Sequence, residues 1–280
     1  MIKDDRVLRA TRVLGAVIVP FLLVAFSLLY LFPGDTVHWF AWPIKPRMTP
    51  LVMGAGYIAG GYFFLRLVTA SHWHRVHLGF LPITAFTLFM AIATFSHLDK
   101  FDKDHVAFWI WVVLYVVTPV LVPLTWLRNR RTDPGTLEAD DRYLPPRVRA
   151  AVGGVGVAQS AVAAVLLLSP STMIDIWPWT LTPLTAQVLG GWFALPGVVA
   201  IMMALDGRWS AIRITLESQV LGIALILLGV IRAWDDFDTS NALTYVFVGG
   251  ISLLLAGLVA LMVFMERVEH PRAAPPLVPV

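Results

Sequence analysis

The sequence predicts an all-α fold, namely a polytopic membrane helical bundle of eight transmembrane helices arranged as two tandem four-helix repeats. Three observations lead to this prediction. Hydrophobic residues make up 58% of the 280 residues and charged residues only 14%, whereas charged residues make up about 25% of ordinary soluble domains. Eight stretches are apolar over the about 20 residues that a membrane span requires. Sequence landmarks also recur at an offset of about 136 residues.

The first unit, residues 1–128, contains four predicted spans, which are 13–32, 50–70, 77–96 and 106–127. The first span follows Lys3, Arg6 and Arg9, as the apolar core of a signal peptide would. Its apolar run is longer than the about 7–15 residues of such a core, and no A-x-A-like cleavage site follows it. We therefore predict that this span is retained in the mature protein.

A cytoplasmic linker, residues 129–148, separates the first unit from the second. Its ends are basic, its centre contains Glu138 and Asp141, and prolines and a glycine interrupt it, as is typical of a solvated loop. The second unit, residues 149–267, contains four more predicted spans, which are 150–169, 184–205, 212–232 and 243–264. Four prolines in the cytoplasmic tail, residues 268–280, predict disorder there.

The repeat is visible in paired landmarks. Arg12 and Pro33 bracket the first span with the same spacing that separates Arg149 from Pro170 around the fifth. The other pairs are Trp42-Pro43 with Trp177-Pro178, Gly54 and Gly56 with Gly190 and Gly191, and Phe101-Asp102 with Phe237-Asp238. Because four spans return the chain to its starting side, we expect two units of the same orientation, related by a pseudo-two-fold axis along the membrane normal. The glycines predict that spans 50–70 and 184–205 approach neighbouring helices closely.

The distribution of basic residues predicts the orientation in the membrane. With the N-terminus in the cytoplasm, 16 of the 21 basic residues face inward, as the positive-inside rule favours. The five that face outward are Lys45, Arg47, Lys100, Lys103 and Arg232. We therefore predict a multi-pass protein of the cell (plasma) membrane with both termini cytoplasmic. This topology accounts for the pI of 9.4 without nucleic acid, so the expected partners are the lipid bilayer and either another membrane protein or a second copy of the chain.

No motif in the chain identifies a catalytic residue or a cofactor. The absence of cysteine excludes disulfides, thiolate metal sites and cysteine nucleophiles. Haem with two histidine ligands would need histidines at matched depth on facing helices, but the second unit has no histidine before His270. The haem A synthases have a similar doubled four-helix plan, and that resemblance ends at the number of spans. The cofactor stays unknown, and we expect a non-enzymatic protein.

Polar groups inside the spans are few, and most belong to the second unit. Glu217 lies within span 212–232, four residues after Arg213 on the same helix face, and an ionisable group within a membrane is a candidate functional residue. Gln219 follows in the same span, and Gln159 lies in span 150–169. We predict a ligand-binding pocket of Glu217, Gln219, Gln159 and Arg213. The alternative is a structural Arg213–Glu217 ion pair with amide hydrogen bonds between helices. Of the eleven tryptophans, only Trp192 lies clearly inside a span, and the others suit an interfacial belt.

One outer loop offers candidate metal ligands. His97, Asp99 and His105 could converge on one ion if the loop folded over the adjoining spans, since imidazole and carboxylate groups bind Zn²⁺ or Ca²⁺. The spacing matches no fixed metal motif, and Lys100 and Lys103 would repel a cation. The alternative is a solvated loop that caps two helices.

Several segments resemble a family of multi-span membrane proteins from actinobacteria and related bacteria. These segments are Phe40-Ala41-Trp42-Pro43-Ile44, Met53-Gly54-Ala55-Gly56-Tyr57, His97-Leu98-Asp99-Lys100-Phe101 and Trp177-Pro178-Trp179. The resemblance would extend over most of the chain. It implies a bacterial inner membrane and no particular activity.

Three classes of function fit the sequence. The first, which we favour, is a non-enzymatic subunit, scaffold or binder of a lipid or other apolar ligand. The second is a small-molecule or ion transporter that uses the polar groups of the fifth to seventh spans. The third is an outer-face metal-dependent membrane enzyme.

Overall fold

The computed structural model describes residues 3–139 and 141–267, and within them the regular structure is helical, with three isolated β-bridges. The eight long helices are α1 (Arg9–Phe26, extended by the π-helical turn η1, Ser27–Leu31), α3 (Met48–Thr69), α4 (Phe80–Ser96, preceded by η2, His77–Gly79), α5 (Val106–Asn129), α6 (Pro146–Leu168), α8 (Pro183–Asp206), α9 (Trp209–Arg232) and α10 (Ala242–Arg267). The short helices are α2 (Thr36–Trp39), α7 (Pro170–Ile174), η3 (Leu98–Lys100), η4 (Arg130–Thr132) and η5 (Trp234–Asp236). All eight long helices, with their extensions, are apolar enough to cross a membrane. The predicted all-α polytopic bundle is therefore confirmed, and the predicted disorder of residues 268–280 lies outside the described residues.

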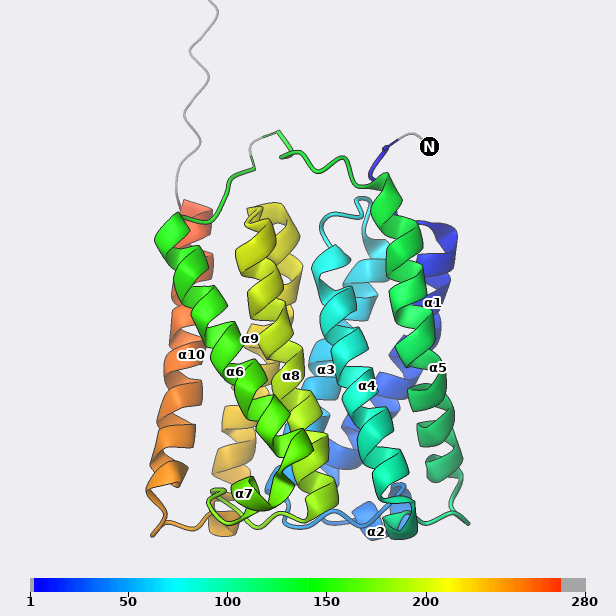
Figure 1. Ribbon diagram of the computed structural model, residues 1–280, viewed down its shortest axis with the longest axis vertical. Coiled ribbons are helices and arrows are strands. Elements are labelled where there is room, and N and C mark those ends of the chain that lie inside the picture. The colour runs from blue at the N-terminus through cyan, green and yellow to red at the C-terminus, as the bar shows by residue number, and fades with distance from the viewer. Residues whose placement is uncertain (1–2, 140, 268–280) are drawn as a thin grey trace, which may run out of the picture.

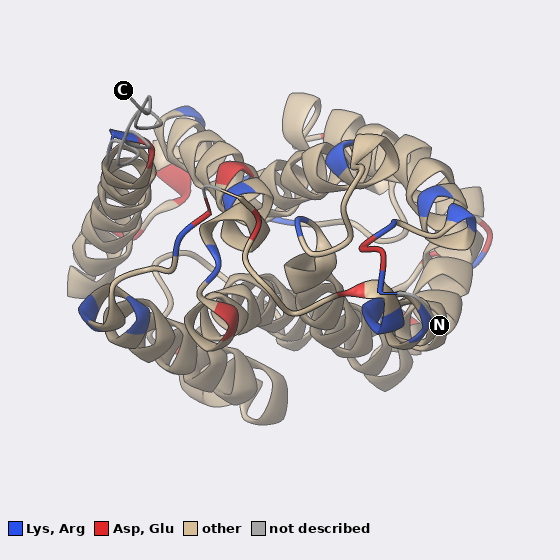
Figure 2. Ribbon diagram, turned by 90° about the horizontal axis from the view of Figure 1, so that it is seen from above, with Lys and Arg blue, Asp and Glu red and all other residues tan. Residues whose placement is uncertain are grey.

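Four helices form the centre of the bundle and four surround them (Figures 1 and 2). Helix α3 packs against α9, and α4 packs against α8; on the outside, α1 covers α3, α5 covers α4, α6 covers α8 and α10 covers α9. Between 39% and 61% of the residues in the spans of α3, α4, α8 and α9 are buried, against 33% or fewer in the outer spans. The outer helices therefore present most of the lipid-facing surface.

The described chain begins and ends at one end of the bundle, here called the linker face because residues 129–139 and 141–145 lie across it (Figure 1). Helices α2 and α7 lie at the opposite face. The linker is anchored by Leu144, which is buried, and by a backbone hydrogen bond of 2.8 Å from its N–H to the carbonyl of Gly207. Gly207 has a φ of +78°, a left-handed conformation that glycine adopts without strain and that ends α8.

Equivalent backbone hydrogen bonds recur in the two halves. On the linker face, the N–H of Trp73 donates to the carbonyl of Asp5 (2.7 Å), and the N–H of Trp209 donates to that of Arg142 (2.8 Å). On the opposite face, Asp102 donates to Ala41 and Asp238 donates to Pro178, both at 2.9 Å. Each pair of contacts is separated by the offset that relates the sequence landmarks, as a tandem repeat would produce.

The centre of the bundle depends on one close approach between α3 and α8. A Cβ atom at Gly56 would lie 2.1 Å from the ring of Trp192, so no larger residue fits there without a shift. The Trp192 ring also makes an edge contact with Tyr57 at a centroid distance of 4.9 Å and packs on Phe86 at 4.4 Å. A tryptophan within a span is thereby accommodated by a glycine on the facing helix.

Candidate functional site

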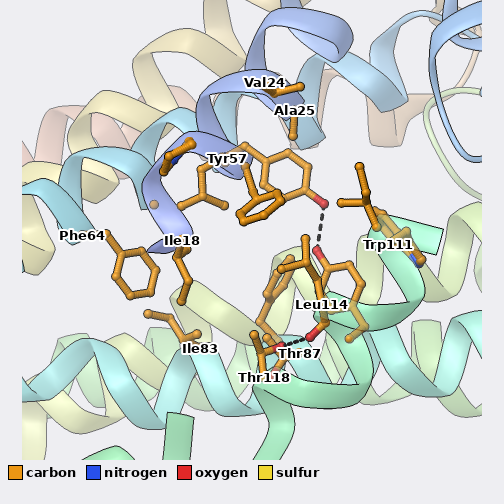
Figure 3. Close-up of a pocket in the computed structure, with 18 of the residues that line it drawn as sticks. Ile18, Val24, Ala25, Tyr57, Phe64, Ile83, Thr87, Trp111, Leu114 and Thr118 are labelled. Atoms are coloured by element: carbon orange, nitrogen blue, oxygen red, sulfur yellow. Dashed lines mark hydrogen bonds between the residues drawn. The ribbon is translucent and has the colours of Figure 1, made fainter. Parts of the chain in front are cut away.

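The bundle contains an apolar cavity of about 340 Å³, here called the first cavity. Helices α1, α3, α4 and α5 line it, with Trp192 and Leu195 from α8. Its volume is at the lower end of the range of about 300–1,000 Å³ that is typical of small-molecule sites. The hydroxyls of Tyr57 and Tyr115, both in its lining, are 2.8 Å apart, and Figure 3 shows the Tyr57 ring beside the cavity.

The first cavity offers a ligand almost no polar group. The two tyrosine hydroxyls bond to each other, and the hydroxyls of Thr87 and Thr118 donate to backbone carbonyls of their own helices. Apart from Trp192, which lines both cavities, what remains is hydrocarbon and aromatic surface, so apolar contacts dominate there.

The first cavity opens toward the side of the bundle. Its lining includes Phe21 and Val24 of α1 and Ile110 of α5, which are 38%, 57% and 42% exposed. Helices α1 and α5 touch each other little, since each packs mainly on a central helix. In a bilayer, this opening would face acyl chains rather than water.

A second cavity, of about 170 Å³, lies mainly among α3, α8, α9 and α10, with α4 and Gln159 of α6 completing its lining. Gln159, Ser218 and Gln219 are part of its lining, as is Trp192, which separates it from the first cavity. The Ser218 hydroxyl donates to the carbonyl of Ala59 at 2.8 Å. The Nε2 atom of Gln219 and the Nε1 atom of Trp192 are buried and have no hydrogen-bond partner among the described residues.

The structure separates the predicted ligand-binding residues into two groups. Gln159 and Gln219 both line the second cavity. Glu217 lies in an ion-pair network instead, in which Arg66 Nη1 approaches its Oε2 at 2.7 Å and Arg213 Nε approaches its Oε1 at 3.2 Å. The Tyr62 hydroxyl also donates to this carboxylate. The alternative of an Arg213–Glu217 ion pair is therefore present in the structure, and a ligand-binding role for Glu217 or Arg213 stays a prediction.

The outer-loop residues that we considered as metal ligands have other contacts. His105 caps α5, since its Nδ1 accepts from the N–H of Ala107 at 3.1 Å, and its Nε2 lies 3.2 Å from the carbonyl oxygen of His38. Asp99 is exposed and pairs with Lys100 at 2.7 Å, and this hydrogen bond lowers the pKa of Asp99. These contacts match the capping alternative, and a metal site at His97, Asp99 and His105 stays a prediction.

The linker face contains a hydrogen-bonded group that the sequence analysis missed, here called the linker-face clasp and defined as Asp5, His74, Ser210 and Asp141. The N–H of His74 donates to Asp5 Oδ1 at 3.0 Å, and its ring Nδ1 contacts Asp5 Oδ2. Ser210 repeats this pattern on Asp141, with its N–H at 3.0 Å from Oδ1 and its hydroxyl at 2.5 Å from Oδ2. The two halves meet where His74 Nε2 lies 3.1 Å from Ser210 Oγ.

The clasp contains aspartate, histidine and serine, but its geometry is not that of a serine nucleophile. A nucleophilic serine must give its proton to the histidine, whereas the Ser210 hydroxyl donates to Asp141. The clasp also adjoins a group with metal-ligand chemistry, because one ligand atom each of Asp5, His74 and Glu138 lies within 4.8 Å of the others. Asp5 and Glu138 contact opposite nitrogens of the one imidazole ring, which suits a bridging imidazole better than a shared ion.

Two further ion pairs hold the linker against the bundle. Arg75 donates to both carboxylate oxygens of Glu138 at 2.9 and 2.7 Å. Burial is the largest single influence on the pKa of Glu138 and raises it, but the hydrogen bonds from Arg75 and the neighbouring basic side chains together lower this pKa below its ordinary value. Arg208, only 6% exposed, pairs with Asp206 at 2.7 Å and with Asp133 at 3.1 Å. Burial likewise raises the pKa of Asp133, but the Arg208 contact, the backbone hydrogen bond from Gly135 and the nearby basic side chains together lower it.

The repeat offset could have located the clasp in the sequence. Asp5 and Asp141 stand one repeat apart, as do His74 and Ser210. This repeat signal is weak in the sequence, because the paired residues share no motif and one pair differs in residue type. Their contact depends on how the chain ends and loops meet in three dimensions.

Comparisons with protein-family models, with curated proteins and with solved structures find no match to this chain. Eight apolar helices make it an integral membrane protein of the multi-pass kind. Among the features described, the two cavities are the ones shaped to receive another molecule.

Proposed function

We propose that this protein binds an apolar, lipid-like molecule within its helical bundle and catalyses no reaction on it. The observation that carries the proposal is the first cavity, which is large, lined by apolar groups and open toward the side of the bundle. Such a molecule would enter from the bilayer through the opening between α1 and α5. The expected setting is a bacterial plasma membrane, with the linker face in the cytoplasm.

The physical chemistry of the bilayer limits how tightly the first cavity can bind. Burying apolar surface gives little net free energy when the competing environment is lipid, which is as apolar as the cavity wall. Selectivity in the first cavity must therefore come from shape and from dispersion contacts with the fixed rings of Tyr57, Trp111 and Tyr115, which are buried.

The helix packing supports the predicted tandem repeat. The packing of α1 on α3 has its counterpart in α6 on α8, and that of α4 on α5 in α9 on α10. Arg12 donates to the carbonyl of Val68 at 3.0 Å, and Arg149 donates to that of Ala204 at 2.8 Å. We infer that the two four-helix units share one plan and that α3 and α8 meet at the axis between them. The first cavity lies mainly within the first unit, whereas residues of both units line the second.

Native mass spectrometry of the protein released gently from its own membrane tests the proposed function. We expect the chain of 31.0 kDa to carry an excess mass that corresponds to a lipid-like molecule. Ala25→Trp should remove it, because Ala25 lines the first cavity and an indole would fill part of that space. Ala158→Trp is the matched control, because Ala158 is exposed on α6 and lines neither cavity. A bare wild-type chain, or equal loss in both variants, would contradict the proposal.

A further inference from the structure

We propose that the second cavity recognises a carbonyl group carried by an apolar molecule, through the side-chain N–H groups of Gln219 and Trp192. This inference rests on the proposed function and specifies the chemical class of the ligand. The ligand would be a neutral compound with an oxygen acceptor on an otherwise hydrocarbon body.

Two unpaired donors at one cavity carry the inference. Gln219 Nε2 and Trp192 Nε1 are buried, have no partner among the described residues, and belong to side chains that line the second cavity. Buried polar groups in native structures are nearly always hydrogen-bonded, and an unpaired one requires an explanation. We infer that an acceptor group of a bound molecule supplies the missing partner.

The donor types define the acceptor. An indole N–H can only donate, and the Gln219 amide nitrogen also donates. The described residues that line the second cavity include no lysine, arginine or histidine, so nothing there would neutralise a carboxylate or a phosphate. Burying an unpaired anion is far costlier than burying a neutral polar group. A carbonyl oxygen, with two lone pairs and no charge, fits both donors.

The donors are held in place by packing. Trp192 is fixed between Gly56, Tyr57 and Phe86, with ring contacts at centroid distances of 4.9 and 4.4 Å to the two aromatic residues. Gln219 follows Ser218, whose hydroxyl ties α9 to α3 through the carbonyl of Ala59. A donor held in this way loses little conformational freedom on binding, which favours recognition.

The first cavity has no counterpart of the two glutamine amides, although Trp192 lines both cavities. One repeat earlier, the position of Gln219 is occupied by Ile83, that of Gln159 by Leu22, and that of Trp192 by Gly56. All three of these apolar residues line the first cavity. The polar groups are therefore a feature of the second unit alone, as expected if this unit recognises the polar part of a ligand.

The size of the second cavity limits the ligand. A cavity of about 150 Å³ can hold benzene, so about 170 Å³ accommodates the carbonyl-bearing part of a ligand, one ring or a short segment of chain, and not the whole of a lipid. Two sources supply this chemistry in a membrane, namely a quinone ring and the acyl ester of a glycerolipid. A water molecule would also fit, and the experiment below distinguishes it.

The test is a native mass spectrometry titration of the full chain in detergent with three probes: decylubiquinone, dioleoylglycerol and the hydrocarbon squalene. We expect at least one carbonyl probe to bind more tightly than squalene. Gln219→Leu should weaken that binding about 2- to 10-fold, the range that corresponds to one neutral hydrogen bond. Gln187→Leu is the matched control, since Gln187 donates to the carbonyl of Leu167 and lines neither cavity.

The outcomes separate the inference from the proposed function. Tighter binding of decylubiquinone identifies the quinone as the source, and tighter binding of dioleoylglycerol identifies the ester. If squalene binds as tightly as both carbonyl probes, or if Gln219→Leu binds them like the wild type, the inference is overturned while apolar binding stands. Water alone in the second cavity would give that second result. If no probe binds, the proposed function itself fails.

Discussion

The carboxylate of Glu217 receives hydrogen bonds from three side chains, Arg66, Arg213 and Tyr62. Its position within a span suggested a ligand site, but its partners hold α9 against α3. Glu217→Gln should lower the free energy of unfolding by about 1–3 kcal/mol, because hydrogen bonds to a charged acceptor are lost. Thermal unfolding in detergent measures this.

Glu266→Gln is the control for Glu217, since Glu266 contacts Arg213 at 3.1 Å and is 41% exposed. We expect it to change stability by less than about 1 kcal/mol. Equal stability of Glu217→Gln and the wild type would remove the structural interpretation and favour a functional role for this residue, such as the transport that the sequence leaves open.

Acid should loosen the linker. The pKa values of Glu138 and Asp133 are lowered in the folded protein, so these groups contribute stability that is complete above their ordinary pKa values of 4.5 and 3.8. That contribution is lost as the pH falls through the folded-state pKa values. We therefore expect the unfolding temperature to fall below about pH 4.5.

The Arg75–Glu138 pair allows this pH dependence to be assigned. Glu138→Gln should make the loss of stability in acid less steep, and Arg75→Gln should do the same, because each removes the interaction that lowers the pKa of Glu138. The double variant should add little to either single variant. An unchanged slope in all three would show that other carboxylates cause the acid sensitivity.

At the scale of helices, the approach of α3 to α8 at Gly56 decides how the centre packs. Gly56→Ala should lower stability by about 1–3 kcal/mol, as overpacking does, because its Cβ would lie 2.1 Å from the Trp192 ring. Gly154→Ala is the control. Nothing lies within 4 Å of the Cβ it would add, so the better helix propensity of alanine should leave stability unchanged or raise it.

A second variant keeps the Gly56 prediction interpretable. Trp192→Phe in the Gly56→Ala background should restore part of the lost stability, because a smaller ring leaves room for the new methyl group. Chemical denaturation of the four proteins measures the coupling. Purely additive losses would mean that Gly56 is constrained by something other than Trp192.

Hydropathy predicted the long helices well, because a membrane span must be apolar over most of its length whatever it packs against. The glycine pattern likewise predicted a close approach on the span that contains Gly56. The contacts of His105 were less predictable, since a histidine that caps a helix and one that binds a metal look alike in sequence. The linker-face clasp was missed because His74 and Ser210 acquire a common role only when the two units are placed together.

The same limit applies to the cavities. Gln159 and Gln219 were predicted to share a site, and they do line one cavity. Glu217 was grouped with them by its depth in the span, yet its contacts are Tyr62, Arg66 and Arg213. Two residues apart on a helix, Glu217 and Gln219 point in different directions, and only the positions of α3 and α6 decide which neighbours each one meets.

At the scale of the whole molecule, the two cavities differ in chemistry. The lining of the first is almost wholly apolar, whereas Gln159, Ser218 and Gln219 are part of the lining of the second. Two neighbouring cavities that differ in this way can hold different parts of one amphiphilic ligand, or two different ligands, within one arrangement of helices.

The orientation of the units can be tested by labelling single introduced cysteines. The chain has no native cysteine, so no native residue has to be replaced first. We introduce one cysteine at a time at Lys103, Thr239 and Thr136, which are exposed. Lys103 and Thr239 stand one repeat apart at the face opposite the linker, whereas Thr136 lies in the linker. With the linker face in the cytoplasm, a membrane-impermeant maleimide should label Lys103→Cys and Thr239→Cys in intact cells, and Thr136→Cys only after lysis.

Each alternative topology gives a different labelling pattern. If the linker face were outside, Thr136→Cys would be labelled in intact cells and the other two would not. If the units were inverted relative to each other, Lys103→Cys and Thr239→Cys would differ. The basic residues around the linker face (Figure 2) favour a cytoplasmic linker face, because positive charge is retained on the cytoplasmic side of a bacterial membrane. The expected result is therefore labelling of Lys103→Cys and Thr239→Cys, but not of Thr136→Cys, in intact cells. Equal labelling of the two repeat-related sites would then support two parallel units, whose corresponding loops lie at the same membrane surface.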